Sequence, residues 1–199
     1  MAIIKSAKEI AMEKSKSIKK LSHDELQQIK QQQKIDHILS RYYKDKIKPD
    51  DLWSYLKNIS KPYLIKAQLN LVHSLTFSSS EFEINKRKKG ILAIENLKGS
   101  TNSNSIEFIF EQLKKVQKDF LNQKEQMMNK IKQELERDPQ KRLQTFRQGQ
   151  QVMVKQMSVE EAINQNKQLK EYLAQMENQF NSQFNQLKQK LQELMEANA

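Results

Sequence analysis

The sequence predicts an all-α protein in which a small helical N-terminal region is followed by a long helical, coiled-coil hairpin. Three observations favour this class. The 199 residues include only three Gly and three Pro, too few for a sheet with many turns, whereas the abundant Gln, Lys, Glu and Leu propagate helix at little cost. Serine and glutamate stand three residues apart at several places, the capping-box signature of a helix start. The second half carries two long apolar stripes with coiled-coil spacing.

The apolar pattern and the loop-forming residues divide the chain into four segments. We expect an amphipathic helix over residues 1–21, a helical core region over 22–77, a linker with one short helix over 78–105, and the coiled-coil hairpin over 106–199. The boundary between the two halves of the chain falls in the third segment, because Ser, Asn and Gly cluster there.

The first segment places aliphatic side chains on one helical stripe with lysines around it. The stripe consists of Ile3, Ile4, Ala7, Ile10, Ile18 and Leu21. A membrane anchor is the weakest interpretation, because the stripe lacks Trp and Phe and because Glu9 and Glu13 oppose attraction to anionic lipid. A core helix is the second interpretation. We expect the third, a docking helix that packs on the body of this protein or on a partner.

The second segment predicts three helices and the compact core. Ser22 and Glu25 form a capping box, and the periodic apolar residues after them predict a helix that Pro49 ends. A short helix follows Pro49, and Pro62 opens the most apolar helix of the chain. The core is expected to contain Trp53, Leu64, Ile65, Leu69, Val72 and Leu75.

The third segment is predicted to be the loosest part of the chain. Loop-forming residues flank a short helix over 91–98 that Gly99 ends. The densest basic cluster of the chain also lies here and consists of Lys86, Arg87, Lys88 and Lys89. A solvated linker is one interpretation of this cluster, and contact with RNA, DNA or another polyanion is the other.

The fourth segment contains two apolar stripes whose residues recur mostly at steps of three and four. The first consists of Ile106, Ile109, Leu113, Val116, Phe120, Met127 and Ile131, and the second of Leu169, Leu173, Met176, Phe180, Phe184, Leu187, Leu191 and Leu194. This spacing predicts two long helices that pair along a coiled-coil seam, with each other or with another copy. Between them, Asp138 and Pro139 predict a short helix ending at Gly149. The alternating residues 150–158 predict an extended connector.

The chain lacks the residue patterns of the common enzyme sites. It contains no Cys, which removes thiol nucleophiles, disulfides and thiolate metal sites. The three histidines, His23, His37 and His73, are too dispersed to share a metal ion, and the isolated glycines form no phosphate-binding loop. We therefore expect no enzyme activity, no cofactor and no metal. The absence of a membrane-spanning run and of a secretion signal predicts a cytoplasmic protein.

Charge and periodicity lead to two hypotheses for function. The first is a non-enzymatic structural or adaptor protein that acts through coiled-coil helix pairing, either as a homo-oligomer or with a protein partner. The second is a polyanion-binding module, because the net charge is +11 and residues 1–100 carry 20 basic against 11 acidic residues. Lysine greatly outnumbers arginine, which favours a general compositional bias over a nucleic-acid surface.

Three stretches resemble an uncharacterised family of short bacterial proteins. These are "AIIKSAKEIAMEK" at the N-terminus, "LAIENLKG" in the middle and the Gln-rich "FLNQKEQMMNKIKQELE". The resemblance implies a bacterial cytoplasmic protein with a short opening helix, a helical middle and a Gln-rich coiled-coil C-terminal half. It supplies no catalytic residues.

Overall fold

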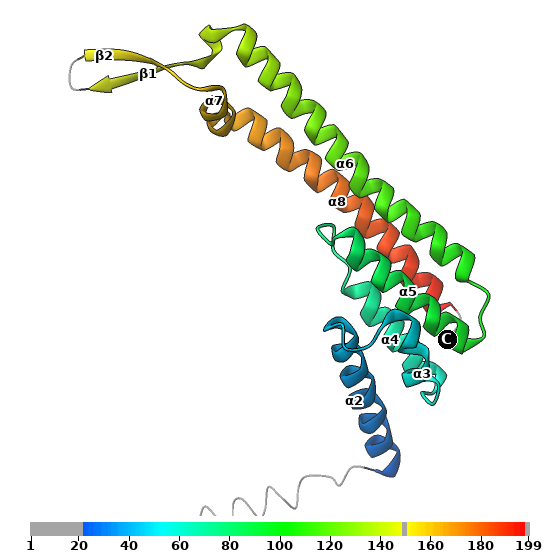
Figure 1. Cartoon of the computed structure of the whole chain (residues 1–199). Helices are drawn as coiled ribbons and strands as arrows, with labels where there is room; N and C mark the ends of the chain where they lie inside the picture. Colours follow the sequence, from blue (N-terminus) through cyan, green and yellow to red (C-terminus); the bar gives the residue numbers. More distant parts are fainter. Residues whose placement is uncertain (1–21, 149–150, 198–199) are drawn as a thin grey trace, which may run out of the picture.

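The computed structural model describes residues 22–148 and 151–197 (Figure 1). Within these residues it contains seven α-helices, two short 3-10 helices and one antiparallel pair of strands, so the predicted all-α class is confirmed apart from that pair. The elements are α2 (His23–Tyr43), η1 (Pro49–Asp51), α3 (Leu52–Leu56), α4 (Lys61–His73), α5 (Glu81–Lys98), α6 (Ser103–Arg137), η2 (Pro139–Arg142), β1 (Leu143–Gln148), β2 (Gln151–Gln156), α7 (Val159–Gln165) and α8 (Lys167–Glu196). None of the described helices is both long and apolar enough to cross a membrane.

The two long helices, α6 and α8, lie along each other and form an arm (Figure 1). With 35 and 30 residues, they are about 52 Å and 45 Å long. At the start of α6, Asn102 donates from Nδ2 to the carbonyl of Leu194 near the end of α8 at 3.3 Å, so the two helices are antiparallel. Helices α2 to α5 form a body that packs against this end of the arm, and the strands project from the other end.

Helix α2 ends at Tyr43, so the expectation that Pro49 would end it is wrong. The end is a Schellman motif, in which Lys46 N donates to Arg41 O at 2.9 Å and Asp45 N donates to Tyr42 O at 3.2 Å. Asp45 takes the left-handed position of this motif, with a φ of 57°. Aspartate tolerates that conformation better than most residues do.

Helix α5 begins at Glu81, so the expectation of a loop before residue 91 is wrong. A capping box opens it, in which Glu83 N donates to Ser80 Oγ at 3.2 Å and Ser80 N donates to Glu83 Oε2 at 2.8 Å. Gly90 lies inside the helix, where an added Cβ would be 3.0 Å from Tyr42 Oη and 3.1 Å from Leu71 Cδ1. The glycine thus permits a close helix crossing. Gly99 ends the helix as expected, with a φ of 68°.

The core of the body contains Leu52 and Leu56 in place of Trp53, so the expected core position of the tryptophan is wrong. Leu52 and Leu56 stand four residues apart on α3 and are fully buried, whereas Trp53 is 51% exposed. A helix of five residues can bury only one narrow face, and two leucines occupy it. The other expected core residues, on α4 and just after it, are buried or partly buried: Leu64, Ile65, Leu69, Val72 and Leu75.

The expectation of a helix between Pro139 and Gly149 is also wrong. Pro139–Arg142 makes only a 3-10 turn, in which Asp138 accepts from Gln140 N at 3.1 Å. The chain then becomes strand β1, which pairs with β2 from Leu143 opposite Gln156 to Gln148 opposite Gln151. The expected extended connector is thus one strand of a pair. Residues such as Phe146 and Val154 favour this pleated conformation.

Polar contacts fix the arm to the body. From α8, Lys188 Nζ donates to the carbonyls of His73 at 3.0 Å and Leu75 at 2.8 Å, which lie at the C-terminal end of α4. From α6, Gln117 Nε2 donates to the carbonyl of Phe77 at 2.6 Å. The ring of Phe77 in turn packs edge-on against Phe184 at a centroid distance of 5.8 Å. Body and arm therefore share one core.

Candidate protein-docking surfaces

The far end of the arm presents apolar side chains on an isolated pair of strands. We call η2, β1 and β2, residues 139–148 and 151–156, the hairpin tip. Five of its apolar side chains are 40–60% exposed: Leu143, Phe146, Val152, Met153 and Val154. The register places Thr145 opposite Val154 and Phe146 opposite Met153, so both faces of the ribbon carry exposed apolar groups. An isolated two-stranded ribbon is marginally stable in water, and a partner surface that covered these side chains would stabilise it.

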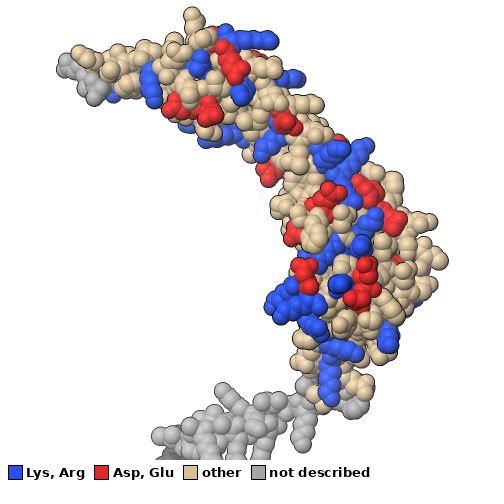
Figure 2. Space-filling model, in the orientation of Figure 1, with Lys and Arg blue, Asp and Glu red and all other residues tan. Residues whose placement is uncertain are grey.

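All charged side chains of the hairpin tip are basic. Between Pro139 and Met157 the chain carries Lys141, Arg142, Arg147 and Lys155 and no Asp or Glu. Two of these lysines reach acidic groups at the root of the tip, Lys141 to Glu134 and Lys155 to Glu161, each at 3.6 Å. Figure 2 shows acidic and basic atoms intermixed along the arm, whereas the outer part of the tip is mostly tan with no red. The tip therefore combines positive charge with apolar surface.

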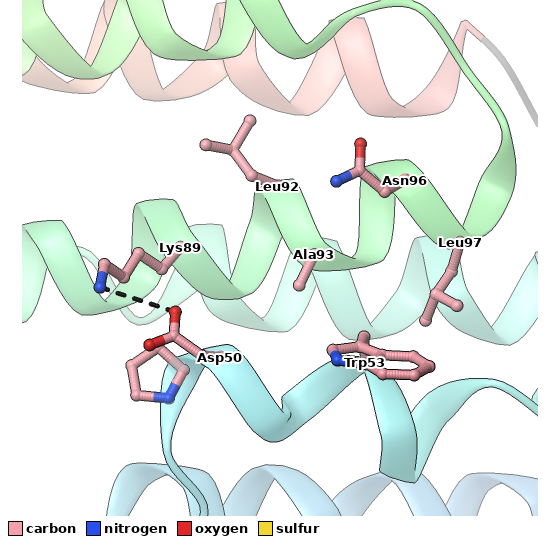
Figure 3. Close-up of a pocket in the computed structure, with 8 residues that line it drawn as sticks. Asp50, Trp53, Lys89, Leu92, Ala93, Asn96 and Leu97 are labelled. Atoms are coloured by element: carbon pink, nitrogen blue, oxygen red, sulfur yellow. Dashed lines mark ion pairs between the residues drawn. The ribbon is translucent and has the colours of Figure 1, made fainter.

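A second candidate surface is a shallow groove of about 560 Å³ in the body, between α5 and the segment of η1 and α3. Ala93 and Leu97 point from α5 toward Trp53 on the opposite wall, as Figure 3 shows. The ion pair between Lys89 and Asp50, 3.7 Å long, lies at one end. The groove offers apolar contact, but it lacks the convergent polar groups that orient a small ligand.

Trp53 provides a direct check of this groove. It is the only tryptophan in the chain, and because it is half exposed we expect a native emission maximum close to that of free tryptophan in water. Iodide should quench it to a similar extent before and after unfolding in urea. A native emission shifted strongly to shorter wavelength, with protection from iodide, would contradict the position of Trp53 on an open wall.

The four basic side chains at residues 86–89 point in different directions and contact different parts of the fold. Lys86 is buried, and its Nζ lies 2.5 Å from Asp45 Oδ1 and 5.3 Å from the centre of the Tyr42 ring. The other three residues contact different elements: Arg87 donates to Ser74 Oγ at 2.8 Å, Lys88 pairs with Glu111 at 3.0 Å, and Lys89 pairs with Asp50. Consecutive residues of a helix point 100° apart, so these cations do not form one surface. Burial also raises the pKa of Tyr42 and of Tyr43 in this region.

The predicted seam residues lie along the inner side of the arm. All fifteen, Ile106, Ile109, Leu113, Val116, Phe120, Met127, Ile131, Leu169, Leu173, Met176, Phe180, Phe184, Leu187, Leu191 and Leu194, are buried or partly buried in the single chain. Phe120 and Phe180 illustrate the pairing, since their ring centroids lie 5.7 Å apart across α6 and α8. The seam is thus filled within one chain and offers little surface to a further helix.

A buried polar cluster lies where α4 crosses α5. Glu95 accepts hydrogen bonds from Gln68 Nε2 at 2.9 Å and from Ser100 Oγ, and its Oε2 lies 3.1 Å from Lys98 Nζ. Burial acts to raise the pKa of Glu95, but these hydrogen bonds and the charge of Lys98 together hold that pKa below its ordinary value. The side chains of Glu95 and Lys98 are almost completely shielded from solvent. The cluster is closed to a substrate and joins helices.

The remaining predicted features are placed as follows. The predicted docking stripe on residues 1–21, Ile3, Ile4, Ala7, Ile10, Ile18 and Leu21, lies outside the described residues. Two apolar side chains at the adjoining end of α2, Leu26 and Ile29, are more than 40% exposed. Among residues 22–148 and 151–197, no group of three or more acidic or histidine side chains is arranged to hold a metal ion.

Sequence reasoning missed the hairpin tip, although a signal for it was present. "LQTFRQ" and "QVMVKQ" contain the strand-favouring residues Thr, Phe and Val, and a two-residue connection containing Gly149 separates them. That is the arrangement expected of a β-hairpin. The pair of Asp138 and Pro139 favoured a new helix instead, and this competing signal hid the first strand.

Comparison with known protein families gives a match over most of the chain. Residues 50–193 match the model of a protein family that is described as a family of unknown function (DUF6657). No curated protein and no solved structure matches the chain. The matched region begins at η1 and ends near the C-terminus of α8, so it includes α3 to α5, the arm and the hairpin tip.

Proposed function

The chain belongs to this family of unknown function, and from that premise we propose that it is a non-enzymatic structural or adaptor protein that binds a protein partner through the hairpin tip. One observation carries the proposal: an isolated two-stranded ribbon stands at the end of a two-helix arm with five apolar side chains 40–60% exposed. Exposed apolar groups of this kind mark interaction sites in soluble proteins. The proposed setting is the bacterial cytoplasm.

The arm supports this role by its construction. Its helices pair with each other, and Lys188 and Gln117 fix them to the body. Coiled-coil helix pairing would therefore act within the chain, as the element that holds the hairpin tip at a distance from the body. Self-association through the same seam would require the two helices to exchange partners, at the expense of the contacts around Phe120 and Phe180.

The alternative function, binding of RNA, DNA or another polyanion by residues 86–89, has weaker support. Its motivation is the net charge of the first half of the chain. Lys86 and Lys88, however, already pair with carboxylates at 2.5 and 3.0 Å, and these contacts would have to be broken before either lysine met a phosphate. Docking of a protein on the exposed apolar side chains of the hairpin tip breaks no ion pair.

Site-specific photo-cross-linking in the cells that produce the protein tests the proposed function. A benzoylphenylalanine replaces Val152 in one variant and Tyr172, an exposed aromatic residue of α8, in the matched control. We expect a discrete protein adduct from position 152 and none from position 172. The adduct should disappear when Val154→Ser is added, while the thermal transition stays within a few degrees of the parent. Equal adducts at both positions, or none at position 152, would refute docking at the tip.

A further inference from the structure

The orientation of the backbone groups in the hairpin tip follows from one hydrogen bond at its root. Met157 N donates to Arg142 O at 2.8 Å, and the register places these two residues directly opposite each other. In an antiparallel pair, opposite residues alternate between hydrogen-bonded and non-hydrogen-bonded positions. Thr145 and Val154, three positions along the ladder, therefore form a non-hydrogen-bonded pair. Their backbone N–H and C=O groups point away from the ribbon.

The same alternation determines which residues of β2 point their backbone N–H and C=O groups outward from the free edge of the ribbon. Val152, Val154 and Gln156 turn their backbone groups outward, and the side chains of Val152 and Val154 are each 60% exposed. An edge of this kind is a template for another strand, because its donors and acceptors lack ladder partners. β-branched residues at alternate positions also suit pairing with a further strand. The edge thus provides both the backbone and the side-chain component of strand addition.

The positive charge of the hairpin tip indicates which kind of partner can bind at the free edge of β2. Arg147 and Lys155 lie on the ribbon, Lys141 and Arg142 lie at its root, and no acidic residue occurs between Pro139 and Met157. A second copy of this chain would bring the same four positive charges to the edge, whereas an acidic segment would be attracted. An anionic membrane would also attract the charges, but the unpaired backbone groups of an open edge cannot be buried in hydrocarbon.

We propose that the free edge of β2 receives an extended acidic segment of a partner protein as a third strand of the sheet. This inference rests on the proposed function and names the chemistry of the partner: acidic side chains alternating with apolar ones, in a segment able to become a strand. The apolar groups would cover Val152 and Val154 on one face of the sheet, and the acidic groups would lie on the other face, beside Lys155.

Two proline variants of the full-length protein separate the two edges. Val154→Pro removes one outward N–H from the edge of β2, and Thr145→Pro, the matched control, removes the outward N–H of the residue opposite on β1. Neither change removes a donor of the internal ladder, and proline is tolerated at edge positions of this kind. Circular dichroism and thermal unfolding of each variant provide the check that the helical arm is intact.

The binding probe is a fluorescein-labelled synthetic octapeptide of alternating glutamate and valine, measured by fluorescence anisotropy. We expect saturable binding to the parent chain and to Thr145→Pro. Binding to Val154→Pro should be about tenfold weaker, because one backbone hydrogen bond of about 1–1.5 kcal/mol is lost. A peptide with lysine in place of glutamate should bind at least tenfold more weakly than the acidic peptide.

The proposal is overturned if the acidic peptide does not bind, if both peptides bind equally, or if the two proline variants bind equally well. Sedimentation with vesicles of phosphatidylserine and phosphatidylcholine tests the membrane alternative. Retention on the vesicles that is unchanged by Val154→Pro, combined with no peptide binding, would identify a membrane surface instead. If the cross-link from position 152 persists in Val154→Pro with a partner that lacks an acidic segment, the proposed function survives and the strand-addition inference falls.

Discussion

Replacing Phe184 by alanine is expected to lower the free energy of unfolding by about 3–5 kcal/mol, the usual cost of removing a fully buried phenylalanine ring. Phe184 belongs to α8, yet it is fully buried in the core that α2 to α5 build. Its ring packs edge-on against Phe77 in the connection between α4 and α5. We therefore expect the substitution to destabilise the body and the arm together, in a single urea transition followed by far-UV and near-UV circular dichroism.

Tyr172→Ala is the matched control for Phe184→Ala. It also removes an aromatic ring from α8, but Tyr172 is about half exposed and lies nearer the hairpin tip, so the cost should stay within about 0.5–1 kcal/mol. Two separate urea transitions for Phe184→Ala would show that the body folds without α8. A loss equal to that of Tyr172→Ala would contradict the shared core.

Replacing Glu95 by alanine is expected to cost about 3–5 kcal/mol, because it leaves the buried ammonium of Lys98 without its counter-charge. Gln68 loses a hydrogen-bond acceptor in the same change. The double variant Glu95→Met with Lys98→Met is the control, since apolar residues of similar size at both positions remove the charge imbalance. In urea unfolding at neutral pH, the free energy of unfolding of the double variant should be at least about 1 kcal/mol higher than that of Glu95→Ala.

The same cluster predicts a loss of stability in acid. The pKa of Glu95 in the folded protein lies below the ordinary value of 4.5, so the unfolded chain takes up a proton first as the pH falls. The stabilisation is therefore complete above about pH 4.5 and is lost as the pH drops through the folded-state pKa. Glu95→Gln should flatten the dependence of the unfolding free energy on pH in this range. A parent and a variant with equal slopes would contradict the assigned contacts of Glu95.

Local signals in the sequence determined where most of the helices begin. The capping boxes at Ser22 and Ser158 form as expected, because the hydroxyl and the glutamate three residues later satisfy each other's backbone amides without help from the rest of the fold. The stripes of α6 and α8 likewise follow from spacing alone, since a period near 3.6 residues places their apolar groups on one face whatever packs against it. The all-α class follows from these same features.

Tertiary packing decided the features that local signals left ambiguous. Gly90 is typical of a loop in the sequence, but in the fold it allows α5 to pass close to Tyr42 and Leu71. Trp53 is the largest apolar residue of its segment, yet a five-residue helix had room to bury only Leu52 and Leu56. The candidate docking site depended on packing most of all. Residues 143–148 became a strand because β2 lies opposite them and completes their hydrogen bonds, and this pairing outweighed the local helix signal of Asp138 and Pro139.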